Sequence, residues 1–351
     1  MNNGLHFIQG NIKNKKVFIL SNYIWFYVPY TWHIKQLKKE NINGPIFFIN
    51  IPELKTSKNY FINLLKNNFL ILKQFLSCDI FIIDGHIGIW MYFFTFSGLL
   101  KNKFTIAYQQ NYTFPKLTLK SIFKYIFLRK YFNNCNYILV NNPTSGEILS
   151  LNLGISLKKF VFSPVPINFD SAENYLKPSK KPGKYILACG KENRDYETFI
   201  KAIKNYPREV RISTQIEIYK KINLDKNITY IRPTNTISMI DLIRDARILV
   251  VPLSSNLNTG GITIIRWGLE LGKAIIVTKR NSILEIYGAN PPFIYVEAND
   301  EIALRNSISE LDSDEEKIIS LGKIAREWTF NNHTSSAFVN NLWKDYINKV
   351  T

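Results

Sequence analysis

Short apolar runs alternate with longer stretches of helical apolar spacing throughout the first half of the chain. Neighbouring runs are far enough apart for a helical crossover, which parallel strands require. The pattern therefore predicts a doubly wound parallel sheet. The expected strands are residues 17–21, 46–51, 79–84, 104–108, 137–140 and 161–163, and the expected helices are 30–40, 60–76, one from about 87, 117–132 and one opened by a Thr144–Glu147 capping box.

The alternation stops at Pro164-Val165-Pro166 and resumes after a stretch rich in proline and lysine. Such a composition is typical of a linker. We therefore predict a first domain at residues 1–168, a linker at 169–184 and a second, similarly built domain at 185–330. The expected strands there are 185–189, 210–214, 228–231, 248–253, 274–278 and 293–296, and the expected helices are 196–205, one capped near Asn235 or Thr236, one after Gly261, a short one capped by Ser282 and Glu285, 300–311 and 314–328.

Residues 248–273 combine a buried-strand pattern with two glycines that are well placed to hold an anion. The β-branched run 248–253 leads through a polar loop to Gly260 and Gly261, where helical spacing begins. Unpaired amides and the positive dipole end at a helix start attract phosphate, and glycine lets the backbone approach it. Two such halves leave a ligand cleft at the carboxyl ends of their sheets. The alternative is that the glycines only end an ordinary crossover.

An excess of basic residues favours an anionic partner. The chain has 45 Lys and Arg against 27 Asp and Glu, a net charge of +18. Residues 1–170 hold 19 of these cations and 6 of these anions, so the first half carries most of the excess. A membrane surface or an acidic acceptor would suit this charge, whereas no nucleic-acid-binding motif accompanies it. An AT-rich genome, which favours Asn, Ile, Lys and Phe, is an alternative source of part of it.

The cysteines and the apolar runs favour a cytoplasmic protein. Cys78, Cys135 and Cys189 lie far apart without a CxxC pair, so we expect neither a disulfide frame nor a zinc site. The N-terminus lacks the continuous apolar core of a signal peptide. The longest uncharged apolar run, residues 87–100, is shorter than the ~20 residues that a membrane-spanning helix needs.

Three segments in and near the second half together carry a specific pattern. Residues 189–202 are CGKENRDYETFIKA, residues 162–170 are FSPVPINFD, and Val251-Pro252 is followed by Gly260-Gly261 and Gly272-Lys273. They resemble the GR…RDY.TLI.A, IPNGVD and VVP…G…EAMA.GKPVIAT segments of GT-B glycosyltransferases, most closely the family-4 retaining enzymes. The likeness covers residues 160–290 well and the first half only in pattern. It implies an α/β GT-B fold, with two Rossmann-like doubly wound parallel sheets facing an interdomain cleft.

Lys191 and Arg194 follow the predicted strand end at Gly190, so their side chains can reach the cleft. In the family, cations in this loop stabilise the leaving nucleoside diphosphate, which implies a catalytic role for both. Negative charge grows on that group as the glycosidic bond breaks, and a preoriented cation offsets it. No metal or other cofactor is then expected, and no carboxylate pair stands out to hold a metal. A solvated basic loop is the alternative.

The donor site that the resemblance implies departs from the family at two positions. Family-4 enzymes usually carry two glutamates around the Gly-rich helix start, and Thr259 and Trp267 occupy those positions here. Glu270 follows three residues after Trp267 and is the candidate for a ribose contact, with a surface charge as the equal alternative. The implied donor-binding residues are Gly190, Thr259, Gly260, Gly261, Ile262, Thr263 and Glu270.

His86 follows the predicted strand 79–84, where members of the family place a histidine against the donor sugar. The resemblance therefore implies a catalytic contact for His86, with a structural histidine as the alternative. It also implies that a terminal helix, residues 331–351, returns to the first domain. Phe338, Leu342 and Tyr346 belong to one apolar stripe of this segment, and such a stripe must be buried.

Residues 117–132 interleave cations with aromatic and aliphatic residues. A basic amphipathic helix of this kind suits an anionic membrane surface. The alternative is a helix that covers the sheet and exposes ordinary lysines. The four cations are Lys120, Lys124, Arg129 and Lys130.

These features together predict a glycosyltransferase, peripheral on the inner face of a membrane. It would move a sugar from a nucleotide-sugar donor to a polysaccharide, lipid-linked or other glycan acceptor in surface-glycan biosynthesis. The resemblance implies a retaining, metal-independent hexosyltransferase. A nucleotide-sugar epimerase is a weaker alternative, because it would need several carboxylates and histidines in the cleft and the chain has 4 histidines. The missing glutamates favour another alternative, a degenerate GT-B subunit that binds a sugar or a partner enzyme without catalysis.

Overall fold

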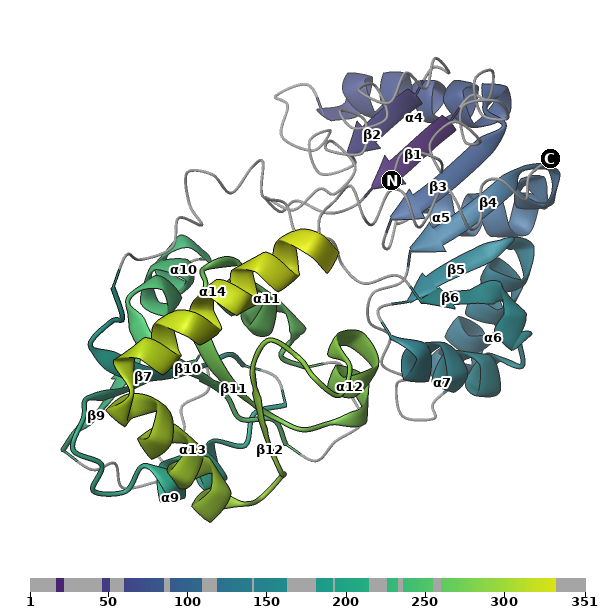
Figure 1. Cartoon of the computed structure of the whole chain (residues 1–351). Helices are drawn as coiled ribbons and strands as arrows, with labels where there is room; N and C mark the ends of the chain where they lie inside the picture. The colour runs from purple at the N-terminus through teal and green to yellow at the C-terminus, as the bar shows by residue number, and fades with distance from the viewer. Residues whose placement is uncertain are drawn as a thin grey trace, which may run out of the picture. The chain divides into compact units, whose positions relative to one another are not determined.

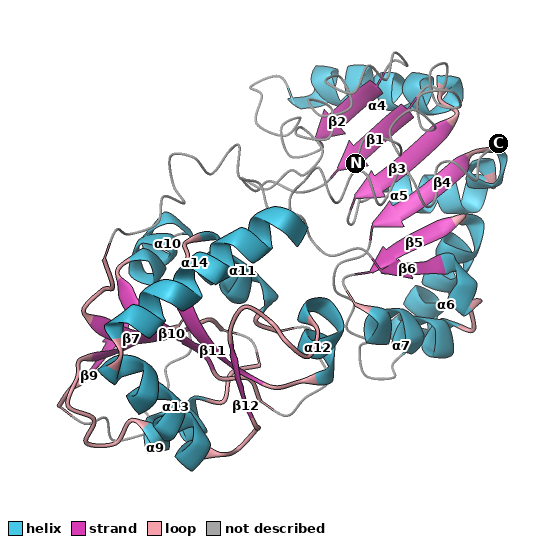
Figure 2. Ribbon diagram, in the orientation of Figure 1, coloured by secondary structure: helices cyan, strands magenta, loops and turns pink. Residues whose placement is uncertain are grey.

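The computed structural model describes residues 17–21, 46–50, 60–84, 89–108, 119–140, 142–162, 181–191, 193–214, 226–232, 236–254 and 260–332. They belong to two units, one within residues 1–166 and one within 167–334 (Figure 1). In each unit the described strands form a parallel sheet that is covered by helices (Figure 2). The expected helix at 30–40, most of the predicted linker and the terminal segment from residue 333 lie outside the described residues.

The sheet of the first unit has the strand order β2-β1-β3-β4-β5-β6. Its strands are β1 (Val17–Ser21), β2 (Ile46–Asn50), β3 (Ile80–Asp84), β4 (Phe104–Tyr108), β5 (Tyr137–Val140) and β6 (Phe160–Phe162). The helices are α4 (Tyr60–Ser77), α5 (Ile89–Ser97), α6 (Leu119–Asn134) and α7 (Pro143–Leu153), with short 3₁₀ turns η1 (Leu99–Asn102) and η2 (Leu157–Lys159).

Aromatic side chains from two helices and a strand pack together in the core of the first unit. The Phe75 ring of α4 lies 5.0 Å from that of Phe81 on β3 and 4.4 Å from that of Phe94 on α5, measured between centroids. All three rings are fully buried, which fixes two helices against the central strands. No helix in the described part of the chain is long and apolar enough to cross a membrane.

The sheet of the second unit has the strand order β12-β11-β10-β7-β8-β9. Its strands are β7 (Tyr185–Cys189), β8 (Val210–Ser213), β9 (Ile228–Ile231), β10 (Ala246–Val251), β11 (Ala274–Thr278) and β12 (Ile294–Val296). The helices are α9 (Tyr196–Ala202), α10 (Thr236–Arg244), α11 (Ile262–Glu270), α12 (Asn281–Tyr287), α13 (Glu301–Ser313) and α14 (Glu315–Asn332).

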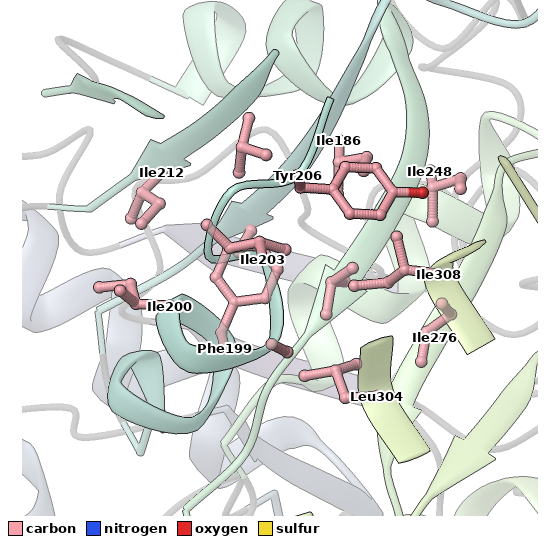
Figure 3. Packing of buried hydrophobic residues seen from close by; sticks show 14 of the residues in the cluster. Ile186, Phe199, Ile200, Ile203, Tyr206, Ile212, Ile248, Ile276, Leu304 and Ile308 are labelled. Carbon is pink, nitrogen blue, oxygen red and sulfur yellow. The ribbon is translucent and has the colours of Figure 1, made fainter. Parts of the chain in front are cut away.

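Strands β7, β10 and β11, in the middle of this sheet, are fully buried and largely apolar because helices cover both faces. On one face, Ile186, Ile248 and Ile276 pack in a cluster with α9 and α13 (Figure 3). On the other face, α11 sits so close to the sheet that a Cβ on Gly268 would lie 2.5 Å from the Leu249 side chain. The helix therefore has little freedom to shift relative to strands β10 and β11.

Two predicted helix caps are wrong. At α7 the cap is Asn142, whose side chain accepts a hydrogen bond from the Ser145 amide at 2.7 Å, and Pro143 occupies the first helical position. Proline there has no amide to satisfy and a suitable φ, so the helix begins before Thr144. At α12 the capping position is Arg280, which makes no side-chain cap, and Ser282 is buried inside the helix.

Candidate functional site

The carboxyl ends of β7 and β10 mark the switch point of the second sheet. From β7 the chain proceeds outwards to β8 and β9, and then returns to β10 on the other side of β7. The loops that follow these two strands therefore leave in opposite directions, and in such sheets ligands usually bind at this point. Gly190 to Arg194 follow β7, and Pro252 to Ser254 follow β10.

The loop after β7 depends on glycine at position 190. Gly190 has a φ of +114°, a backbone conformation that residues with a side chain rarely adopt, and a Cβ there would lie 2.3 Å from Nη2 of Arg194. The Arg194 side chain thus lies back across Gly190, and its Nε donates a hydrogen bond of 2.9 Å to the Cys189 carbonyl. Tyr196, which is buried, donates its hydroxyl proton to the Gly190 carbonyl. These contacts hold a partly exposed guanidinium at the end of β7.

Backbone hydrogen bonds join this loop to the loop after β10. Arg194 and Leu253 form an antiparallel bridge. On either side of it, the Asp195 amide donates to the Pro252 carbonyl at 2.9 Å and the Ser254 amide to the Asn193 carbonyl at 3.1 Å. The Leu253 amide also donates to Oγ1 of Thr278, at the end of β11, at 2.9 Å. The ends of three strands are therefore fixed to one another.

The glycine before α11 brings the start of that helix onto the same structure. Gly261 is the N-cap residue, with a φ of +95°, and a Cβ there would lie 2.8 Å from the Leu253 side chain. Only glycine allows both the conformation and the approach. Leu253 consequently contacts Gly261 and pairs with Arg194, so the helix start and the basic loop are tied through one residue.

The arrangement is suited to an anion. The first amides of a helix have no intrahelical partner, and the helix dipole makes that end positive. Lys191 is exposed beside this end of the sheet, and Gly260, Gly261 and Ile262 are partly exposed. Together with Gly190, Arg194 and the exposed Thr263, these predicted residues lie along one edge of the second sheet. Thr259 lies outside the described residues.

Glu270 is not available for the ribose contact that we considered for it. Its side chain is 0% exposed at the far end of α11, where Oε1 lies 3.6 Å from Nε of Arg266. The helix turns this position towards α14, and Nη1 of Arg326 donates to the Glu270 carbonyl at 2.6 Å. Burial raises the pKa of Glu270 to about 7, against the opposing effects of Arg266 and Arg326. We therefore exclude Glu270 from the candidate site.

Cys189, at the end of β7, is not a nucleophile. Its side chain is fully buried, and burial raises the pKa of the thiol to about 12 although Arg194 acts in the opposite direction. The neutral thiol is the unreactive form. Within the ranges that the structure describes, no three His, Cys, Asp or Glu residues lie close enough to hold a metal ion. Metal independence stays a prediction.

In the first unit the corresponding switch point lies between β1 and β3. His86 follows β3 by two residues, but it lies outside the described residues. The catalytic contact predicted for His86 therefore stays a prediction. The parallel pairing of Ser21 with Asp84 aligns the carboxyl ends of these two strands.

A cavity of about 190 Å³ lies at the opposite edge of the second sheet. Arg247, Gly272 and Lys273, which contribute to its lining, lie at or before the amino ends of β10 and β11. The Lys273 ammonium donates to the Ala246 carbonyl at 2.8 Å, and burial lowers its pKa to about 8. This cavity is therefore separate from the predicted donor residues.

The sequence predicted the candidate residues at the carboxyl ends of β7 and β10, but not the contacts between them. The hydrogen bond from Arg194 to the Cys189 carbonyl and the seam between residues 193–195 and 252–254 were not predicted. The available signal was a glycine followed four residues later by an arginine, which is common in loops. Only the sheet order shows that the two loops are neighbours.

No protein-family model matches the sequence, and a search of curated proteins finds no match. Solved structures match in fold. A glycosyltransferase from Rickettsia africae aligns with 95% of this chain and 99% of its own, at a TM-score of 0.59 and 18% identity. Anabaena HepE in complex with UDP-glucose aligns with 96% of this chain and 100% of its own, at a TM-score of 0.61 and 10% identity. Sucrose-phosphate synthase from Thermosynechococcus elongatus aligns with 96% of this chain and 99% of its own, at a TM-score of 0.61 and 13% identity.

These matches confirm the predicted fold class. The chain has the α/β GT-B fold, with two Rossmann-like parallel sheets. It therefore resembles GT-B glycosyltransferases in fold, as its motifs indicated.

Proposed function

We propose that this protein is a glycosyltransferase that takes its sugar from a nucleotide-sugar donor. The observation that carries the proposal is the junction at the switch point of the second sheet, where the Gly261 helix start and the Lys191–Arg194 loop are joined through Leu253. A nucleoside diphosphate is the leaving group that such a site fits. The solved complex of Anabaena HepE with UDP-glucose supports the same donor class.

The site would act on the leaving group. As the bond between the sugar and the diphosphate breaks, negative charge collects on the phosphate oxygens. The amides at the start of α11, the Lys191 ammonium and the Arg194 guanidinium would offset this charge, with Arg194 already oriented by Cys189 and Gly190. Removing one such oriented group typically costs about 10²–10³-fold in turnover.

The finer parts of the proposal rest on the sequence resemblance. They are a retaining, metal-independent transfer of a hexose, a glycan or lipid-linked acceptor in surface-glycan biosynthesis, and attachment to the anionic inner face of a membrane. Lys191 and Arg194 would supply the positive charge that a metal ion supplies elsewhere. His86 is proposed to contact the donor sugar.

Thr259 and Trp267 support one competing function, a GT-B subunit that binds without catalysis. Neither residue can act as the carboxylate that the family usually places there, and the Trp267 side chain is buried. This alternative predicts no transfer under any donor and acceptor condition.

Nucleotide binding tests the proposed function directly. Thermal unfolding is followed with a panel of nucleoside diphosphates, and at least one should raise the midpoint, because a ligand at 100 times its Kd stabilises the native state by about 2.7 kcal/mol. Lys191→Ala should weaken the binding of this nucleoside diphosphate and so reduce the shift of the midpoint. Lys323→Ala, which removes a cation that is 77% exposed on α14, is the matched control and should leave binding unchanged.

Turnover is then measured as release of the nucleoside diphosphate from its sugar. Lys191→Ala should lower it by ~10²-fold or more. A protein that binds no nucleoside diphosphate contradicts the proposal. One that binds the diphosphate but never releases it from the sugar nucleotide is the non-catalytic subunit.

A further inference from the structure

Helices α5 and α6 of the first unit expose large apolar side chains side by side. Phe123 is 75% exposed and Phe96 is 63% exposed, and four neighbouring residues are exposed as well. Isolated exposed apolar residues are ordinary, but a contiguous group marks an interaction surface. This group, the α5–α6 aromatic surface, consists of Tyr92, Phe93, Phe96, Ile122, Phe123 and Ile126.

Ring contacts show that the two helices present one surface. Phe127 of α6 is buried, and its ring stacks on Tyr92 of α5 at 4.3 Å and lies 6.0 Å from Phe96. Phe123 is one helical turn before Phe127, so its exposed ring follows along the same side of α6. The two helices pack against each other. The aromatic side chains of α5 therefore continue into the apolar residues of α6.

The charged residues of α5 and α6 all have one sign. Lys124, Arg129 and Lys130 are exposed on α6, and Nζ of Lys130 lies 4.9 Å from the centre of the Phe96 ring. Between Asp84 and Glu147 the sequence contains seven Lys and Arg and no Asp or Glu. An apolar patch on two helices whose charged residues are all cations suits a surface that combines hydrocarbon with negative charge.

We propose that the α5–α6 aromatic surface inserts into the interfacial region of an anionic lipid bilayer. A nucleic acid would satisfy the cations but not Ile122 and Ile126. Because α6 has 16 residues with cations along its length, it would lie in the plane of the interface rather than cross the bilayer. The inference deepens the proposed function, on which it rests for a lipid-linked acceptor, by naming the contact surface.

This arrangement changes the expected character of the binding. The sequence predicted attraction by four cations, which salt would screen over about 8–10 Å. Insertion of Phe96 and Phe123 adds an apolar contribution that salt does not screen. Burying one phenylalanine side chain corresponds to roughly a tenfold or larger change in a partition coefficient.

Flotation with lipid vesicles tests the proposal. The full chain should bind phosphatidylcholine vesicles that contain phosphatidylglycerol, prefer them to pure phosphatidylcholine, and retain part of this binding in high salt. Phe96→Ser with Phe123→Ser should lower the partition coefficient at least ~10²-fold, as two lost insertions imply. Phe330→Ser is the matched control, because Phe330 is also 63% exposed but lies on α14 of the second unit, and it should bind like the parent.

A charge-reversal variant separates the electrostatic contribution to binding from the apolar one. Replacing Lys124, Arg129 and Lys130 with Glu should abolish the preference for anionic vesicles. Equal vesicle binding by the double serine variant and its parent would overturn the proposal, as would a parent that does not bind vesicles at all. A concentration-dependent dimer that the serine variant loses, without vesicle binding, would overturn it in favour of a second copy of the chain.

Nucleotide binding distinguishes failure here from failure of the proposed function. The double serine variant should keep the thermal shift produced by the nucleoside diphosphate, because both phenylalanines are exposed and lie in the other unit. Vesicle binding without any nucleotide binding would contradict the glycosyltransferase and leave the lipid surface in place. Nucleotide binding without vesicle binding would contradict the lipid-binding surface and leave the proposed glycosyltransferase in place.

Discussion

Gly190 and Gly261 show how single residues shape the candidate site. Both have positive φ, and at both the space that a Cβ would need is taken, by the Arg194 guanidinium and by the Leu253 side chain respectively. Glycine permits the backbone conformation at both positions and also makes room for a residue of the proposed site. A substitution should therefore cost stability and displace a functional group at the same time.

Gly190→Ala separates these two effects when it is compared with Gly98→Ala. Gly98 also has positive φ, +73°, but a Cβ there would meet nothing within 4 Å. Gly98→Ala should therefore lose only about 1 kcal/mol of unfolding free energy from backbone strain, with nucleotide affinity unchanged. Gly190→Ala should lose more and should weaken nucleotide binding, measured by thermal shift. Equal affinity in both variants would show that Arg194 need not stay in place.

Arg194→Lys tests whether orientation matters beyond charge. The ammonium keeps the positive charge, but it cannot donate from Nε to the Cys189 carbonyl while presenting a second nitrogen to a ligand. We expect turnover at least ~10-fold below the parent, with the thermal unfolding midpoint nearly unchanged. Turnover equal to the parent would mean that the cation acts through charge alone.

At the scale of elements, α11 is the helix that joins the site to the core. Its N-terminal end belongs to the proposed anion site, and its C-terminal end buries Glu270 beside Arg266. Among the described residues, neither carboxylate oxygen of Glu270 accepts a hydrogen bond. The charged form is therefore poorly stabilised, which agrees with a pKa raised to about 7.

This pKa makes the stability of the second unit depend on pH. The pKa of Glu270 is higher in the folded state than the ordinary value of 4.5, so the fold binds this proton more tightly than the unfolded chain does. The resulting stabilisation is full below pH 4.5, falls as the pH rises through 7 and is absent above it. Glu270→Gln should flatten the fall in unfolding free energy between pH 5 and 8, by about 2 kcal/mol.

Thermal unfolding midpoints measured across that pH range check the expectation. Glu327→Gln, which changes an exposed carboxylate on α14, is the control and should keep the slope of the parent. If Glu270→Gln also keeps that slope, the pair with Arg266 outweighs burial and holds Glu270 ionised.

The sequence predicted elements whose pattern is set by burial on both sides. Strands β7, β10 and β11 were found because every residue in them is buried, so each contains a continuous run of apolar residues. β10 begins two residues earlier than predicted because Arg247 is buried in the strand, where its Nε pairs with Asp312 at 2.8 Å. In a pattern of apolar residues an arginine marks the end of a strand, and only its pairing with Asp312, which is distant in sequence, shows that the strand includes it.

Helix faces were harder to predict than helices. For the segment 117–132 we expected either a helix that binds a membrane surface or one that covers the sheet, and the sequence did not show which of its apolar residues are exposed; Phe123 and Ile126 are exposed beside Lys124. Which residues of α6 are covered depends on where α5 packs, and helical periodicity does not contain that information. The position of Glu270 was missed for the same reason, since its burial depends on the contact of α11 with α14.

At the scale of the whole molecule, the two proposed activities belong to different units. The switch-point residues from Gly190 to Thr263 and the core beneath them lie within residues 167–334. The α5–α6 aromatic surface and its cations lie within residues 1–166. Sugar-nucleotide binding and membrane binding should therefore be separable by cutting the chain between the units.

A fragment of residues 167–334 should fold and bind the nucleoside diphosphate without the first unit. Its sheet has its own buried core, shared by α9, α13 and the central strands, so it should unfold in one cooperative transition. Because the residues of the proposed anion site all lie within this fragment, its Kd for the nucleoside diphosphate should stay within about tenfold of that of the full chain, and Lys191→Ala should weaken binding equally in both. The fragment should neither bind anionic vesicles nor transfer sugar. A fragment that unfolds cooperatively yet binds no nucleoside diphosphate would show that the donor site needs residues from the first unit, with His86 the first to test.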